Sequence, residues 1–155
     1  MAQAIWLLRH GDAEPGDAGA DADRRLTPDG ERQARMAGRA LAALGLEFAA
    51  VVTSPRVRAR DTARLAAEAL GVEPSAHEPL SGDFGAEDAV DLLAGHDDDA
   101  HLLLVGHEPD FGQVIRDLTG ARTHLEKGGV AAVRVDKGEL MVLLRPRELD
   151  AIGGA

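Results

Sequence analysis

The amino-acid sequence predicts an α/β fold, a three-layer α/β/α sandwich around a mostly parallel central sheet with one antiparallel strand near the C-terminus. Two observations favour this fold. Short apolar runs without polar alternation are typical of parallel strands that helices cover on both faces. Helix patterns separate these runs along the chain, which is the alternation of a parallel α/β sheet. The three apolar runs span residues 4–8, 48–52 and 101–105.

The first helix is predicted to begin after Thr27. A threonine side chain can accept a backbone hydrogen bond at the N-cap, and Pro28 suits the first helical position. Leu41 and Leu44 follow at helical spacing, and Gly45 is a typical terminator.

Three further helices follow from the same kinds of signal. The second is expected over residues 55–70, where Gly71 ends it, with a stripe of alanines on one face. The third is expected over residues 86–94. The fourth is expected over residues 111–118, and Gly120 follows it.

The last part of the sequence predicts a β-hairpin. Apolar runs at 130–135 and 140–144 flank Asp136, Lys137 and Gly138, which form a turn signal. The hairpin supplies the antiparallel strand. Because no repeat or interdomain linker is visible, we expect residues 1–155 to form a single domain, with residues 11–25 as a loop large enough to border an active site.

Composition excludes several classes of function. The chain has 17 basic and 27 acidic residues, and its net charge of −10 repels nucleic acid and anionic membranes. The absence of cysteine removes disulfides, thiolate metal sites and thiol nucleophiles. No apolar run approaches the roughly 18 residues of a membrane span. We therefore expect a cytoplasmic protein with no nucleic-acid or membrane partner.

Arginine and histidine side chains follow the three predicted strands at the points where they end. Arg9 and His10 follow the first strand, Arg56 and Arg58 the second, and His107 the third. The carboxyl ends of parallel strands meet at one edge of the sheet, where ligands of α/β proteins bind. Arginine forks match phosphate oxygens, and helix N-termini attract anions. The sequence therefore predicts a phosphate site at this edge.

Other interpretations of these residues are less consistent with the pattern. Each residue alone is typical of a solvated surface or of a structural histidine, so their joint placement carries the prediction. A metal site at His10 and His107 would suffer repulsion from the neighbouring arginines and lacks helical ligand spacing. No glycine-rich dinucleotide or nucleotide motif follows a strand. We expect no metal and no cofactor.

The segment Leu8-Arg9-His10-Gly11 resembles the signature, or RHG motif, of the histidine phosphatase superfamily, also called phosphoglycerate mutase-like. The resemblance continues through residues 26–30, 54–63 and 105–109, in the family's order. The short chain and its Gly-His-Glu-Pro segment look most like the SixA-type phosphohistidine phosphatases. Larger relatives carry insertions that this chain lacks.

This resemblance implies that His10 is the nucleophile and forms a phosphohistidine intermediate that water hydrolyses. It assigns the phosphoryl oxygens to Arg9, Arg58 and His107, and it places Gly11 against the substrate. Arg58 is selected because the family's arginine directly precedes an alanine. A bound anion would favour a protonated His107. The arginines would take the role that magnesium has in kinases, so no metal is required.

The remaining charged residues near these motifs have other expected roles. Arg56 and Arg60 are expected at the rim or on the helix surface. Arg25 resembles a family position near the pocket. The general acid, which many relatives supply as a glutamate after the second helix, has no clear equivalent here, and Glu78 and Asp83 are the candidates.

The predicted function is hydrolysis of phosphohistidine on a protein partner. A phosphorylated imidazole leaves as a much weaker base than an alkoxide, so it needs less help from a general acid. Without a capping insertion, the site should also be open to a side chain on another protein. Two alternatives stay open: a phosphatase of small phosphomonoesters, and a non-catalytic module that binds phosphoproteins.

Overall fold

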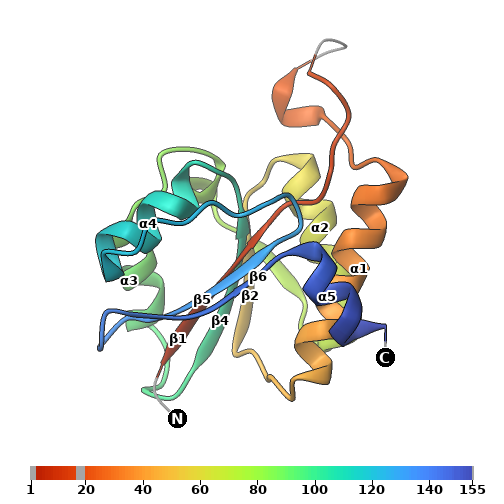
Figure 1. The fold of residues 1–155 in the computed structure, drawn as a ribbon. Helices are drawn as coiled ribbons and strands as arrows, with labels where there is room; N and C mark the ends of the chain where they lie inside the picture. The colour runs from red at the N-terminus through yellow and green to blue at the C-terminus, as the bar shows by residue number, and fades with distance from the viewer. Residues whose placement is uncertain (1–2, 17–19, 155) are drawn as a thin grey trace.

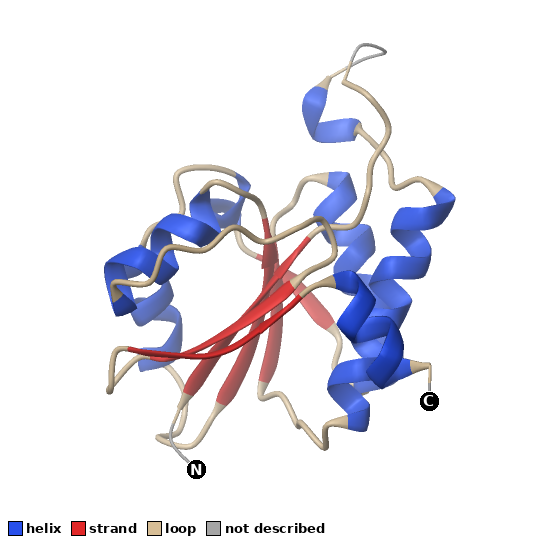
Figure 2. Ribbon diagram, viewed as in Figure 1, coloured by secondary structure: helices blue, strands red, loops and turns tan. Residues whose placement is uncertain are grey.

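A six-stranded sheet runs through the middle of the molecule, with helices packed on both of its faces (Figures 1 and 2). The computed structural model describes residues 3–16 and 20–154. The strands are β1 (Ala4–Arg9), β2 (Ala50–Thr53), β3 (Pro74–Ala76), β4 (His101–Gly106), β5 (Val130–Arg134) and β6 (Glu139–Leu144). The helices are α1 (Pro28–Ala43), α2 (Val57–Leu70), α3 (Ala86–Ala94), α4 (Asp110–Thr119) and α5 (Pro146–Gly153).

The sheet is mostly parallel, as predicted. Its strand order is β3-β2-β4-β1-β5-β6. β4 pairs in parallel with both β1 and β2, and β2 pairs in parallel with β3. β5 pairs antiparallel with β1 and with β6, so among the described strands it alone runs against the others. The predicted hairpin therefore supplies the one antiparallel strand.

The two faces of the sheet are covered by different helices, which makes the three layers. Trp6 and Leu8 of β1 lie in a core shared with α1, α2 and α5. Ile5 and Leu7 point to the other face and lie in a core shared with α3 and α4. Full burial of one leucine contributes roughly 1.5–3 kcal/mol, so a strand that is apolar on both faces is fixed firmly in place.

The helix ends follow the predicted signals. Thr27 caps α1 by accepting a hydrogen bond from the Gly30 amide at 3.0 Å, and Pro28 is its first residue. Gly71 and Gly120 end α2 and α4 in the left-handed conformation, with φ of 69° and 79°. α2 begins at Val57, two residues later than predicted.

Four elements lay outside the sequence prediction. β3 has three residues and begins with proline, so it carries no apolar alternation. α5 is short, and exposed pairs between Arg145 and Glu148 stabilise its start. The other two are 3₁₀ turns, η1 (Asp21–Asp23) and η2 (Glu78–Ser81). η1 falls within the predicted loop 11–25, and it brings an acidic residue toward α2.

None of the helices in the described ranges is both long and apolar enough to cross a bilayer.

Candidate active site

The ends of β1, β2 and β4 bring His10, Ser54 and His107 to one edge of the sheet. The parallel register aligns these ends, since Arg9 lies opposite Gly106. The His10 amide continues the ladder to the Gly106 carbonyl at 3.1 Å, and the Ser54 amide bonds the Val105 carbonyl at 2.9 Å. The convergence predicted at the strand ends is therefore present.

The backbone of His10 is also held from its other side by the segment that precedes β5. The Arg9 amide donates to the Gly129 carbonyl at 3.0 Å. The Gly128 amide donates to the carbonyls of Arg9 and His10 at 3.1 and 3.0 Å. The strand end that carries His10 is thus fixed by neighbours on both sides.

The ring of His10 is buried, and a hydrogen bond fixes its orientation. Nδ1 lies 2.7 Å from the carbonyl oxygen of Gly11, so a neutral ring carries its proton on Nδ1. The lone pair is then on Nε2, which is free to act as a nucleophile. Burial, aided by the charges of Arg58 and Arg9, lowers the pKa of His10 to about 4, although the bond to Gly11 opposes this. His10 is therefore neutral at pH 7.

Gly11 has a packing role that differs from the predicted contact with substrate. A Cβ atom at this position would lie 2.5 Å from the Gly30 carbonyl oxygen at the start of α1. The Gly11 amide donates to the Thr62 hydroxyl at 3.0 Å, and that hydroxyl donates to the Arg58 carbonyl at 2.7 Å. These contacts join the His10 loop to both α1 and α2.

His107 lies beside His10, and its ring is also buried. The two ring centroids are 5.2 Å apart. Nε2 of His107 is 2.8 Å from the Ser54 hydroxyl oxygen. Burial, with further contributions from His10 and Arg58, lowers the pKa of His107 to about 3. In the ligand-free protein His107 is therefore neutral, and the protonated form expected from the sequence requires a bound anion.

Arg9 and Arg58 approach the site from different elements. Arg9, at the end of β1, donates through Nη1 to the Leu125 carbonyl at 2.9 Å. Arg58, in the first turn of α2, is buried and donates through Nη1 to the Asp21 carbonyl at 2.9 Å. Burial lowers the pKa of both guanidinium groups. Because the ordinary pKa of arginine is very high, both groups stay charged at pH 7.

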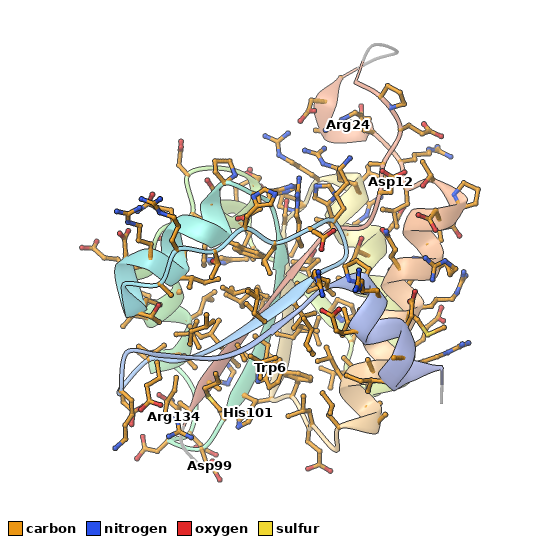
Figure 3. The ribbon with its side chains drawn as sticks, viewed as in Figure 1. Trp6, Asp12, Arg24, Asp99, His101 and Arg134 are labelled. Atoms are coloured by element: carbon orange, nitrogen blue, oxygen red, sulfur yellow. The ribbon has the colours of Figure 1, made fainter. Side chains whose placement is uncertain are left out.

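Three buried nitrogens at this edge have no hydrogen-bond partner among the described residues: Arg9 Nε, Arg58 Nε and His107 Nδ1. Buried polar atoms are normally paired, so such orphans call for an explanation. Other unpaired atoms belong to Thr123 and to Trp6, His101 and Arg134, and Figure 3 places these last three toward the opposite end of the sheet.

The unpaired nitrogens of Arg9, Arg58 and His107 differ from the others because they belong to basic side chains gathered around His10. A phosphoryl oxygen is the kind of acceptor that such donors would bind.

The loop before α1 places Arg24, rather than Arg25, beside this group. Arg24 donates to the Asp21 carboxylate at 3.0 Å and contributes to the positive field that lowers the pKa of His10. The Arg25 side chain is exposed and makes no hydrogen bond with a described residue. The resemblance pointed to Arg25, and a loop has no periodicity that would show which of two adjacent side chains turns inward.

Arg56 and Arg60 lie where they were expected. Arg56 sits at the rim, donating through Nε to the Ser81 carbonyl at 2.7 Å and through Nη1 to Asp21. Arg60 is exposed on α2.

The two candidates for the general acid lie in the turn η2 and two residues beyond its end. Glu78 is exposed and bonds the Ser81 hydroxyl, 3.3 Å away. Asp83 is exposed, with a φ of 60°, and makes no hydrogen bond with a described residue. Neither carboxylate has a hydrogen bond or ion pair with His10 or Arg58, so the structure identifies neither as the acid.

A cavity of about 550 Å³ opens beside Arg9. Its lining includes Lys127, Arg145 and Arg147. His10 does not line it, so this cavity adjoins the histidine pair rather than containing it.

Comparisons with known proteins agree with the motif pattern. A family model described as histidine phosphatase superfamily (branch 1) matches residues 5–90, which is more than half of the 155 residues. An uncharacterised protein of Picosynechococcus sp. is 38% identical over 138 residues, covering 84% of each chain. Phosphohistidine phosphatase SixA of Escherichia coli K12 is 29% identical over 140 residues, covering 86% of each chain.

Solved structures share the fold. A protein histidine phosphatase SixA complexed with tungstate superposes with a TM-score of 0.83 at 23% identity, covering 94% of this chain and 99% of that one. A phosphoserine phosphatase of Entamoeba histolytica, bound to 3-phosphoglyceric acid, gives a TM-score of 0.77 at 18% identity, covering 95% and 99%. Because the family model spans the first three strands together with α1 and α2, and a 38% identical relative extends the likeness over most of the chain, this protein belongs to the histidine phosphatase superfamily.

Proposed function

We propose that this chain is a phosphatase that hydrolyses phosphohistidine on a protein partner through a covalent phosphohistidine intermediate on His10. The observation that carries the proposal is the pairing of a neutral, oriented His10 with buried, unpaired donors on Arg9, Arg58 and His107. Phosphoryl transfer requires a nucleophile next to hydrogen-bond donors that can bind the phosphoryl oxygens.

The first step is an in-line attack by Nε2 of His10 on the phosphorus atom. The new Nε2–P bond forms as the P–N bond to the substrate imidazole breaks. The substrate ring carries a proton from solvent on its other nitrogen, so it leaves as a neutral imidazole. Arg9 and Arg58 hold the phosphoryl oxygens and balance their charge, so the step needs no metal ion. His107 donates to the same group once the anion has raised its pKa.

The second step returns the enzyme to its starting state. Water attacks the phosphorus atom, the Nε2–P bond breaks, and inorganic phosphate leaves. The bond from Nδ1 to the Gly11 carbonyl keeps the ring in one orientation through both steps. His10 therefore ends neutral, with its lone pair on Nε2 again.

The exposed positions of Glu78 and Asp83 support a phosphoramidate substrate. An alkoxide leaving group needs a proton from a nearby acid, whereas both candidate carboxylates are exposed and have no hydrogen bond or ion pair with His10 or Arg58. A protonated imidazole is a far better leaving group. The name of the Escherichia coli relative, a phosphohistidine phosphatase, agrees with this choice.

Small phosphomonoesters are the second candidate substrate. The phosphoserine phosphatase of similar fold and the 550 Å³ cavity beside Arg9 favour it, since that cavity could hold the rest of a small molecule. The two candidates differ in their leaving groups, which gives the means to separate them.

The deciding experiment compares a phosphohistidine-labelled phosphotransfer domain with an alkyl phosphate under the same conditions. We expect loss of label from the domain, slow turnover of the alkyl phosphate, and a transient phosphate adduct by intact mass. His10→Ala should form no adduct and release no phosphate. Preferred turnover of the alkyl phosphate would move the assignment to phosphomonoesters. Tight binding of the labelled domain without release would make the protein a phosphoprotein-binding module.

A further inference from the structure

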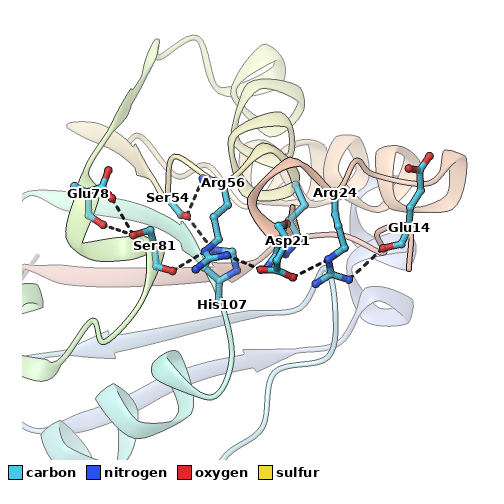
Figure 4. Close-up of polar contacts among 9 residues, drawn as sticks. Glu14, Asp21, Arg24, Ser54, Arg56, Glu78, Ser81 and His107 are labelled. Carbon is cyan, nitrogen blue, oxygen red and sulfur yellow. Dashed lines mark hydrogen bonds and ion pairs between the residues drawn. The ribbon is translucent and has the colours of Figure 1, made fainter. Parts of the chain in front are cut away.

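The carboxylate of Asp21 forms ion pairs with three arginines from two parts of the chain. Figure 4 labels two of them, Arg24 and Arg56. Arg24 Nε lies 3.0 Å from Oδ1, and Arg58 Nη2 lies 3.2 Å from Oδ2. Arg56 Nη1 also contacts Oδ2. Asp21 belongs to the turn η1, whereas Arg56 and Arg58 lie at the start of α2. The contact therefore joins the loop that precedes α1 to the phosphoryl-binding side of the site.

Asp21 lies between Arg58 and solvent. The side chain of Arg58 is 7% exposed and that of Asp21 is 55% exposed. The side-chain hydrogen bonds of Arg58 to described residues go to the carbonyl and carboxylate of Asp21. Asp21 therefore holds both Nη atoms of Arg58 and leaves Nε without a partner among the described residues, so a phosphoryl group that binds Nη1 or Nη2 takes the place of an Asp21 oxygen.

The charge balance at this point favours such an exchange. Partial burial works to raise the pKa of the Asp21 carboxyl, but Arg58 and Arg24 outweigh it and hold that pKa below its ordinary value. Asp21 is therefore a permanent monoanion at neutral pH, set against three cations. Two positive charges remain uncompensated, which matches the charge of a phosphoryl dianion better than that of a second monoanion.

We propose that Asp21 is a specificity-determining residue, an internal anion that occupies the arginines of the ligand-free site and is exchanged for the phosphoryl group of the substrate. The inference rests on the function proposed above. Exchange of one monoanion for another gains little Coulomb energy, whereas exchange for a dianion uses the excess positive charge. Asp21 thereby selects phosphoryl dianions against carboxylates and phosphodiesters, and it competes with product phosphate for the same arginines.

A purely positioning role for Asp21 predicts the opposite result. If the carboxylate served only to hold Arg58 in place, its removal would leave Arg58 less ordered and anion binding weaker. If the carboxylate is a competitor, its removal strengthens binding. The sign of the change in affinity separates the two roles.

The test is calorimetric titration of inorganic phosphate and of formate into the wild type, Asp21→Asn and Asp23→Asn at pH 7.5. Asp23 is the matched control, because it lies in the same turn, is exposed, and pairs with none of these arginines. We expect Asp21→Asn to bind phosphate about three to ten times more tightly and to gain measurable formate binding. Asp23→Asn should behave as the wild type.

Weaker or unchanged phosphate binding in Asp21→Asn would overturn the proposal. Asp21→Ser gives a second variant without the charge, and thermal unfolding confirms that each variant is folded. Turnover of a phosphoramidate is measured separately. A wild type that binds phosphate but turns nothing over would contradict the proposed phosphatase activity, while the affinity comparison would still decide the role of Asp21.

Discussion

The rings of His10 and His107 lie with their centroids 5.2 Å apart and their planes inclined by 55°. Both rings are neutral in the ligand-free protein, because burial lowers their pKa values to about 4 and about 3. Protonation of either ring would place a cation close to Arg58 and to the other histidine. A bound dianion reverses this balance, so the charge state of the pair depends on whether the site holds an anion.

The first prediction concerns the protonation of these rings in the free protein. Nitrogen NMR of the histidine side chains should show both rings neutral from pH 7 down to pH 5, with protonation of His10 near pH 4. His10→Gln and His107→Gln assign the two sets of signals. Titration of either ring near the ordinary value of about 6.5 would show that its burial does not govern its charge.

The second prediction follows from the same values and concerns stability. A histidine whose folded pKa is lowered stabilises the fold fully above its unfolded pKa of about 6.5, and this contribution is lost as the pH falls toward the folded value. Between pH 7 and pH 5 this histidine becomes protonated in the unfolded chain, whereas the buried His107 ring of the folded protein stays neutral. The free energy of unfolding therefore falls by about 2 kcal/mol over this interval.

Denaturant unfolding at the two pH values measures this cost. His107→Gln should lose about 2 kcal/mol less than the wild type over that interval. His96→Gln, which replaces a histidine of the loop before β4, is the control and should lose as much as the wild type. Equal losses in His107→Gln and the wild type would contradict the prediction.

Anion binding should be coupled to proton uptake. Sulfate is a useful probe because it stays a dianion near pH 6, and its charge raises the pKa of His107. Titration calorimetry in buffers with different ionisation enthalpies should show uptake of up to about one proton by the wild type. His107→Gln should show much less. Binding without any buffer dependence would mean that His107 stays neutral against the anion.

Glu108 should position Arg9 through the backbone of Leu125. Its buried carboxylate accepts from the Leu125 amide at 2.9 Å and from the Gly112 amide, and the Leu125 carbonyl accepts from Arg9 at 2.9 Å. Glu108→Ala leaves buried amides unpaired, which costs roughly 1–3 kcal/mol of folding free energy. The affinity for phosphate should also fall in this variant, because Arg9 is no longer held in place through Leu125.

Gln113→Ala is the control for this substitution, because Gln113 lies in α4 and, within the described part of the chain, its side chain bonds only the exposed Asp117. Both variants are compared by denaturant unfolding and by phosphate titration. A Glu108→Ala protein that is destabilised but binds phosphate normally would show that Glu108 supports the fold without ordering Arg9.

The parts of the fold that the sequence predicted are those with strong local patterns. β1 and β4 are apolar on both faces and could only be central strands. Thr27, Pro28, Gly71 and Gly120 mark helix ends by conformational preferences that belong to single residues. β3 has no such signal, because its three residues are ordered by pairing with β2 rather than by their own pattern.

The site divides in the same way. His10 and His107 were predictable because strand ends of a parallel sheet meet at one edge. The inward turn of Arg24 and the approach of Asp21 to α2 depend on how a loop of irregular sequence packs, and no local pattern encodes this. The neutral state of His107 depends on burial in three dimensions, so residue spacing could not predict it.

The hydrogen bonds that fix the backbone of Arg9 and His10 have a consequence for how the protein is made. β1 leaves the ribosome first, yet its partners Gly106, Gly128 and Gly129 are synthesised much later. A nascent chain that stops short of Gly106 thus carries the histidine without the neighbours that orient its backbone. Such a chain lacks His107 as well, so the proposed phosphoryl-binding residues come together only after β4 has been made.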